Sequence, residues 1–152
     1  MTILKKNIKI LLTVFILLGL SFNFNPSNAA SGSSGSDGSD KTSLYKSGKK
    51  LGMKIAAEIF ADRNYEDDGN LVSRSKENAM IIDPEIAQKH VIKMVESQAL
   101  NCYSGKQIPC EIDSVCVHGD EKSAVNTAKQ IKEGLIKSGV TLNPLDKMKK
   151  FV

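Results

Sequence analysis

The run SVCVHGD, residues 114–120, constrains the fold of this chain more than any other stretch. Its first half is small, apolar and β-branched, and we expect a buried strand over residues 112–117. Such strands belong to parallel sheets that helices cover on both faces. Its second half, His118-Gly119-Asp120, does not suit a strand interior but does suit a turn beside an active site. The run therefore predicts a parallel α/β fold with functional side chains where this strand ends.

Strands and helices alternate over the rest of the chain. The predicted order is helix, strand, long loop, helix, strand and helix, which implies parallel βα units. The elements are a helix ending at Gly52, a strand over residues 54–60, a loop over residues 66–82, a helix starting at Asp83-Pro84-Glu85, a loop over residues 101–111, the strand over residues 112–117 and a helix ending at Gly139. Two strands make a poor parallel sheet, because both faces and both edges need cover. We therefore interpret this body as a piece of something larger.

The two longer helices have recognisable starts and apolar faces. Asp83 can cap the first free N–H groups of one helix, and Pro84 is tolerated at a first helical position. His90 falls inside the apolar face of that helix. A packing role is favoured over a ligand role, because no acidic or Cys partner lies one turn away. The expected core positions are Ile86, Ala87, Val91, Met94 and Val95 on the first helix and Ala124, Val125, Ala128, Ile131, Leu135 and Ile136 on the second.

Residues 1–30 have the three parts of a secretory signal peptide. A Lys-containing start precedes an apolar run over residues 10–20, and small residues at Ser27 and Ala29 flank a cleavage point. The run of about 11 residues is shorter than the roughly 20 that span a bilayer as a helix. An uncleaved N-terminal anchor is the alternative, and it would be the expected link to a membrane. The leader thus predicts an exported or membrane-anchored protein.

The remaining chain divides into a linker, one partial domain and a tail. The linker is rich in Ser, Gly and Asp, which cannot bury apolar surface. The packable part, about 110 residues, is enough for a small domain. The predicted boundaries are 1–30 for the signal peptide, 31–43 for the linker, 44–145 for the domain and 146–152 for the tail.

Charge and aromatic content disfavour nucleic acid as a partner. The formal net charge of +4 comes largely from Lys5, Lys6 and Lys9, and the first thirty residues contain no acid. Without that leader, 18 basic residues face 17 acidic ones. Aromatic residues make up 5% of the chain and Trp is absent, which argues against a stacking platform. A nearly neutral body offers no basic stripe for phosphate backbones.

Both predicted strands end in residues that carry chemistry. The first is followed by Asp62-Arg63 and the second by His118 and Asp120. Because ligands bind at the C-terminal ends of parallel strands, we expect Asp62 and His118 to face one opening. His118 could then serve as a general acid or base. In the alternative interpretation Asp120 caps the following helix and His118 is a bystander, and spacing does not separate the two.

At these residues the chain resembles the LamB/YcsF family. The matching segments agree in order and spacing. They are EIFADRNY (residues 58–65), GNLVSRS (69–75), DPEIA (83–87), DSVCVHGD (113–120) and the GV pair at Gly139-Val140. The resemblance covers roughly residues 44–145 and corresponds to the C-terminal part of a typical member. It implies the last βα units of an incomplete β/α barrel related to polysaccharide deacetylases.

The resemblance also implies an activity. Members of the family act as the A subunit of bacterial 5-oxoprolinase, which opens the ring of 5-oxo-L-proline to L-glutamate by ATP-dependent hydrolysis with partner subunits. The implied residues are Asp62, His118 and Asp120 for catalysis and Glu58, Arg63, Tyr65 and Arg74 for substrate binding. The first two could order or deprotonate the attacking water. The arginines could hold a carboxylate or phosphoryl group, or could instead form ion pairs that close the long loop.

Several features depart from the family pattern. Upstream hallmark segments of the family do not occur in this sequence, and Glu121 stands where members usually have Thr. A truncated, exported, non-catalytic remnant or binding module is therefore the second hypothesis. The leader indicates export, whereas the family is cytoplasmic and requires ATP. The sequence has no glycine-rich phosphate loop ending in GKS or GKT, so ATP is implied by the resemblance alone.

The three cysteines, Cys102, Cys110 and Cys116, form an odd count. In an exported chain, Cys102 and Cys110 could pair across their loop and leave Cys116 as a buried thiol, whereas in a cytosolic chain all three would stay reduced. A zinc site formed with His118 lacks the close CxxC spacing of such sites, so no metal is expected.

Overall fold

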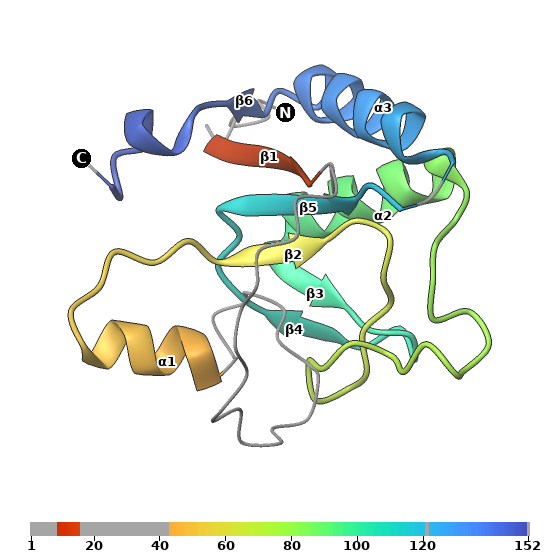
Figure 1. Cartoon of the computed structure of the whole chain (residues 1–152), viewed down its shortest axis with the longest axis horizontal. Helices are drawn as coiled ribbons and strands as arrows, with labels where there is room; N and C mark the ends of the chain where they lie inside the picture. The colour runs from red at the N-terminus through yellow and green to blue at the C-terminus, as the bar shows by residue number, and fades with distance from the viewer. Residues whose placement is uncertain (1–8, 16–42, 121, 152) are drawn as a thin grey trace, which may run out of the picture.

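A four-stranded parallel sheet lies at the centre of the structure (Figure 1). The structure is a computed structural model, and it describes residues 9–15, 43–120 and 122–151. The strand order in the sheet is β2-β5-β1-β6, while β3 and β4 form an antiparallel hairpin. The elements are β1 (Lys9–Phe15), α1 (Ser43–Lys50), β2 (Glu58–Phe60), α2 (Pro84–Ser97), β3 (Ala99–Asn101), β4 (Gln107–Pro109), β5 (Ser114–His118), α3 (Ala124–Lys137), β6 (Thr141–Leu142) and the 3-10 helix η1 (Leu145–Lys147).

The hydrophobic core lies between the sheet and the helices α2 and α3. In β5 the first four residues are buried, as expected for a strand inside a parallel sheet. Alternate residues of β2 and β5 join the apolar faces of both helices, because side chains on a strand alternate between its two faces. These core residues include Ile59, Val115 and Val117 from the strands, Val91, Met94 and Val95 from α2, and Ile131 and Leu135 from α3.

The helix α2 confirms the predicted start. One carboxylate oxygen of Asp83 accepts hydrogen bonds from the backbone N–H groups of Glu85, at 2.8 Å, and Ile86, at 3.0 Å. These bonds satisfy N–H groups that have no partner within the helix. The expected core positions are buried except Ile86, whose side chain is largely exposed. The buried positions are Ala87, Val91, Met94 and Val95.

The helix α3 differs from the prediction at its start and on its buried face. Its N-cap is Ser123, so the expectation that Asp120 caps this helix is wrong. Val125 and Ile136 are exposed rather than buried. The reason is a close crossing with α2, where a Cβ added at Gly134 would lie 2.8 Å from the Gln88 side chain. This contact centres the buried face on positions that include Thr127 and Gly134 and rotates the two apolar residues into solvent.

The sheet has two more strands than the sequence predicted. The expected parallel pair is confirmed by β2 and β5, but β6 comes from residues after Gly139 and β1 comes from within residues 1–30. β1 pairs with β5 on one edge and β6 on the other. The signal peptide, its cleavage and the domain boundaries stay predictions. None of the helices in the described ranges is long and apolar enough to cross a bilayer.

The segment after Leu142 is folded against the domain. Met148 is buried, and Lys150 Nζ contacts carboxylate oxygens of Glu111 and Asp113. Asp113 in turn accepts a hydrogen bond from the backbone N–H of Ala57 at 2.8 Å. Burial opposes the charged form of Lys150, yet hydrogen bonds to the two carboxylates raise its pKa overall. Lys150 therefore ties the end of the chain to the starts of β2 and β5.

The hairpin β3–β4 rules out the pairing of Cys102 with Cys110. The Cys102 N–H donates to the carbonyl of Lys106 at 2.8 Å, and the Cys110 N–H donates to the carbonyl of Gln98 at 3.0 Å. The two cysteines thus lie at opposite ends of the hairpin, about 13 Å apart along the strands, and a disulfide needs Cα atoms within roughly 7 Å. The expectation of this disulfide is therefore wrong for the folded chain.

We expect all three thiols to survive mild oxidation of the folded protein. Burial raises the pKa of Cys102, and burial followed by the charges of Glu58 and Asp62 raises the pKa of Cys116 to about 12. Little reactive thiolate of Cys102 and Cys116 is therefore present at neutral pH, and burial shields Cys110 from the oxidant. Alkylation in urea after diamide treatment, read by peptide mass, should recover three alkylated cysteines. A peptide pair bridged between Cys102 and Cys110 would contradict the hairpin.

Candidate functional site

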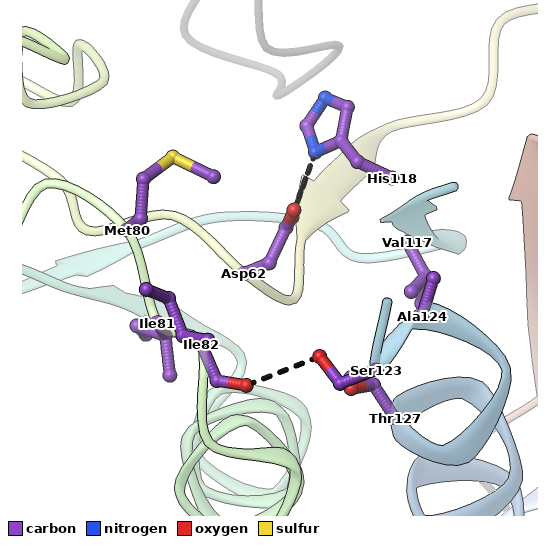
Figure 2. Close-up of a pocket in the computed structure, with 9 residues that line it drawn as sticks. All are labelled: Asp62, Met80, Ile81, Ile82, Val117, His118, Ser123, Ala124 and Thr127. Carbon is purple, nitrogen blue, oxygen red and sulfur yellow. Dashed lines mark hydrogen bonds and ion pairs between the residues drawn. The ribbon is translucent and has the colours of Figure 1, made fainter. Parts of the chain in front are cut away.

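Asp62 and His118 form the closest pair of titratable side chains at the C-terminal ends of the parallel strands. In the β2–β5 register Phe60 lies opposite Cys116, so the residues two positions further on also meet. His118 Nδ1 lies 2.7 Å from one carboxylate oxygen of Asp62 and 2.9 Å from the other. Figure 2 shows both side chains pointing toward one another. This confirms the predicted common opening for these two residues.

The pairing fixes the orientation of the imidazole. An ionised carboxylate only accepts hydrogen bonds, so Nδ1 carries the proton and donates it to Asp62. The other ring nitrogen, Nε2, points away from Asp62 (Figure 2). Asp62 is buried, whereas the His118 side chain is 26% exposed. The arrangement therefore leaves Nε2 able to take a proton from a group that reaches it through the exposed side.

Phe60 holds the imidazole from a second direction. Its ring stacks on that of His118, with centroids 5.2 Å apart and planes inclined by 8°. The backbone N–H of Phe60 donates to the hydroxyl of Tyr65 at 2.8 Å, and Tyr65 is fully buried. Tyr65 therefore fixes the backbone at the end of β2, and the Phe60 ring that this backbone positions packs against the imidazole of His118. The alternation of side chains along the strand could have indicated Phe60, since it lies two residues before Asp62.

A small hollow lies beside the pair. Its cavity volume is about 10 Å³, close to the space that one water molecule needs. The long loop closes one side, where the backbone N–H of Ile81 donates to the carbonyl of Asp62 at 2.9 Å and the Ser123 hydroxyl donates to the carbonyl of Ile82 at 3.4 Å. Nothing in the loop sequence indicated these residues, because they are placed by the fold. The lining residues are Asp62, Met80, Ile81, Ile82, Val117, His118, Ser123, Ala124 and Thr127.

Arg63 lies just before the long loop and Arg74 lies within it, and neither lines the hollow. Arg63 is buried and donates to the carbonyl of Val72 at 2.8 Å, and its Nε is buried without a hydrogen-bond partner. Burial, and then the charge of Arg74, lowers the pKa of Arg63. Arg74 is exposed. Arg63 therefore closes the loop, as the alternative interpretation had it, but through a backbone carbonyl rather than an ion pair.

The other predicted site residues also lie outside the hollow. Glu58 accepts a hydrogen bond from the Ser114 hydroxyl at 2.7 Å, one strand length behind the pair. Tyr65 has no exposed surface with which to touch a substrate. Asp120 is exposed. Among the described residues, no group of three or more His, Cys, Asp or Glu side chains could hold a metal ion.

We expect Tyr65→Phe to destabilise the protein by about 1–2 kcal/mol, because it leaves the part-buried N–H of Phe60 without its acceptor. Urea unfolding measures the loss. Tyr103→Phe is the matched control, since Tyr103 is 58% exposed and should change stability by less than about 0.5 kcal/mol. Equal unfolding midpoints for both variants would show that the hydrogen bond of the Tyr65 hydroxyl does not contribute to the stability of the fold.

Comparisons with known proteins agree with the sequence resemblance. The model of the LamB/YcsF family matches residues 36–150. The A subunit of a 5-oxoprolinase from Clostridium beijerinckii is 44% identical over 107 residues, which are 70% of this chain and 42% of that protein. The corresponding protein from Azorhizobium caulinodans is 46% identical over 93 residues, which are 61% of this chain and 37% of that protein. The chain therefore spans about two-fifths of the length of these curated relatives.

A solved structure shares the fold. The crystal structure of a lactam utilization protein from Thermus thermophilus superposes with a TM-score of 0.59 and 28% sequence identity. The match covers 66% of this chain and 40% of that one. The α/β fold of this chain is thus similar to part of a protein whose name refers to lactams.

Proposed function

Because this chain belongs to the LamB/YcsF family, we propose that it supplies the water-directing part of a 5-oxoprolinase. The full reaction would be the ATP-dependent hydrolysis of the lactam in 5-oxo-L-proline to give L-glutamate. The observation that carries this proposal is the Asp62–His118 pair beside a water-sized hollow. The names of the curated relatives and of the similar crystal structure supply the substrate class, a cyclic amide.

The pair has the geometry for general base catalysis. With Nδ1 held by Asp62, the Nε2 atom of His118 takes a proton from water as the oxygen attacks the carbonyl carbon of the lactam. The C–N bond of the ring then breaks, and the imidazolium returns its proton to the leaving nitrogen, which becomes the amine of glutamate. Asp62 stays ionised throughout and stabilises the imidazolium, as the carboxylate does in a hydrolase triad.

The hollow beside Asp62 and His118 does not have room for a nucleotide. The hollow is far smaller than ATP, and its walls are mainly apolar. The nearest buried cation, Arg63, is already engaged with the carbonyl of Val72. No step at this hollow therefore uses ATP in the proposed mechanism. The naming of the relatives as A subunits implies further subunits, and we assign nucleotide binding to the rest of that assembly.

The test is glutamate release from 5-oxoproline and ATP by the full chain mixed with the partner subunits of a 5-oxoprolinase. Release above that of the partner subunits alone supports the proposal. No added release from a chain with a folded circular dichroism spectrum would reject it and favour a binding module without catalysis. If no release is seen, an isothermal titration with 5-oxoproline shows whether the chain still binds the lactam, as a binding module would.

A further inference from the structure

The strand β1 occupies a position that the rest of the sheet requires. It lies between β5 and β6 and is the element that joins them. On one edge its residues run in register with all of β5, from Leu11 opposite Ser114 to Phe15 opposite His118. On its other edge it pairs with β6, where Lys9 lies opposite Thr141. Without β1, β6 would lose its pairing to the sheet.

The partner strand β5 is built for an interior position. Its first four residues are buried, and β2 covers only its other edge. An edge strand exposes a row of unpaired N–H and C=O groups, which proteins normally cover or blunt with charges. The β5 sequence SVCVH contains no Lys, Asp, Glu or Pro that would protect such an edge. The second edge of β5 therefore requires an apolar strand to pair with it.

The segment Lys9–Phe15 has the composition for this position. Its sequence KILLTVF is apolar or β-branched after the first residue, which suits a strand buried on both faces. The chain between Phe15 and Ser43 also exceeds the dozen or so residues that a parallel crossover needs. These same apolar residues lie in the run that the sequence predicts as the core of a signal peptide.

We propose that Lys9–Phe15 is an integral strand of the folded domain, held on the β5 edge, so that folding and membrane insertion of the leader exclude each other. The backbone groups of residues 11–15 cannot pair with β5 while the run enters a translocation channel or a bilayer. Removal of the leader at Ala29 would also remove the occupant and open the β5 edge beside His118. The folded protein therefore retains these residues. This inference is independent of the proposed enzyme activity.

A disulfide trap in the full chain tests the placement. Position 13 lies opposite Cys116 in the β1–β5 register, so the two Cα atoms are within the distance that a disulfide bridges. We expect Thr13→Cys, refolded from urea in a glutathione redox buffer so that the thiols react before Cys116 is buried, to form an intramolecular bond with Cys116, seen by peptide mass. Val125→Cys is the control, because Val125 is 77% exposed on α3 whereas Cys116 is buried, and it should form no bond with Cys116. Absence of the bond in Thr13→Cys, or a bond that links two molecules, would overturn the proposal.

A second measurement follows the backbone. We expect Leu12→Pro to speed hydrogen exchange of peptides covering residues 114–118 at least tenfold, because proline removes an N–H and its ring disrupts a central strand. Val125→Pro, in the first turn of α3 where proline is tolerated, should leave that exchange within about twofold of the parent. Equal exchange in the two variants would overturn the proposal. If Leu12→Pro does not stay soluble, the disulfide trap decides, because Thr13→Cys is nearly isosteric.

Discussion

Replacing His118 with glutamine lowers glutamate release by the assembled enzyme about 10²–10⁴-fold, the range expected when a general base is lost. Glutamine keeps a side-chain N–H that can donate to Asp62 but has no group that takes a proton from water. The stacking partner Phe60 and the buried carboxylate stay in place. The loss should therefore appear in kcat, measured at saturating 5-oxoproline, with little change in the circular dichroism spectrum.

The control for this variant is Lys89→Gln. Lys89 is exposed on α2, and its Nζ contacts Glu85 at 2.7 Å, an exposed pair one helical turn away. Such pairs contribute little to stability and lie away from the hollow. Lys89→Gln should keep the parent rate within about twofold. A His118→Gln variant that matches Lys89→Gln in kcat would remove the basis of the proposed mechanism.

Acid should destabilise the fold through His90. Burial, and then the charge of Lys93, lowers the pKa of His90 from 6.5 to about 4, against a smaller opposing effect of a hydrogen bond with the backbone of Arg63. The unfolded chain therefore binds a proton at a higher pH than the folded one. The stability from neutral His90 is complete above pH 6.5 and is lost as pH falls toward 4. The loss is about 3 kcal/mol, from 1.4 kcal/mol for each pH unit of the shift.

A double comparison isolates this effect from the carboxylates that also titrate. Urea unfolding of the parent and of His90→Leu at pH 7 and pH 4 gives four free energies. We expect the parent to lose about 3 kcal/mol more than the variant. Leucine suits the site, because His90 Nε2 is buried without a hydrogen-bond partner. Equal losses in both proteins would mean that His90 is protonated without cost in the folded state.

The sequence predicted those parts of the fold whose signals are local. The Asp-Pro-Glu start of α2, the stop at Gly139 and the apolar run of β5 depend on short-range chemistry, and each is present in the structure. The meeting of Asp62 with His118 was also predictable. It follows from one rule, that neighbouring parallel strands end at the same edge of a sheet.

The remaining features depend on contacts between distant segments. Nothing local indicates that Gly134 must pack against Gln88, and this contact decides which apolar residues of α3 face solvent. The buried guanidinium of Arg63 could not be told from a substrate ligand, because the loop that covers it has no periodic pattern. The apolar run at residues 10–20 fits both a signal peptide and a buried strand, so its sequence does not show that β1 lies beside β5.

The contacts of Lys150 place the end of the chain at one pole of the molecule, and Asp62 and His118 lie at the other pole. Glu111 and Asp113 hold the last residues at the pole where β2 and β5 begin, whereas Asp62 and His118 lie at the opposite pole. An affinity tag or a fluorophore fused after the final residue would project from the first pole. A chain immobilised through its C-terminus would therefore present the imidazole to dissolved small molecules. Deleting the last few residues would instead leave Glu111 and Asp113 without Lys150 and would weaken the packing where β2 and β5 begin.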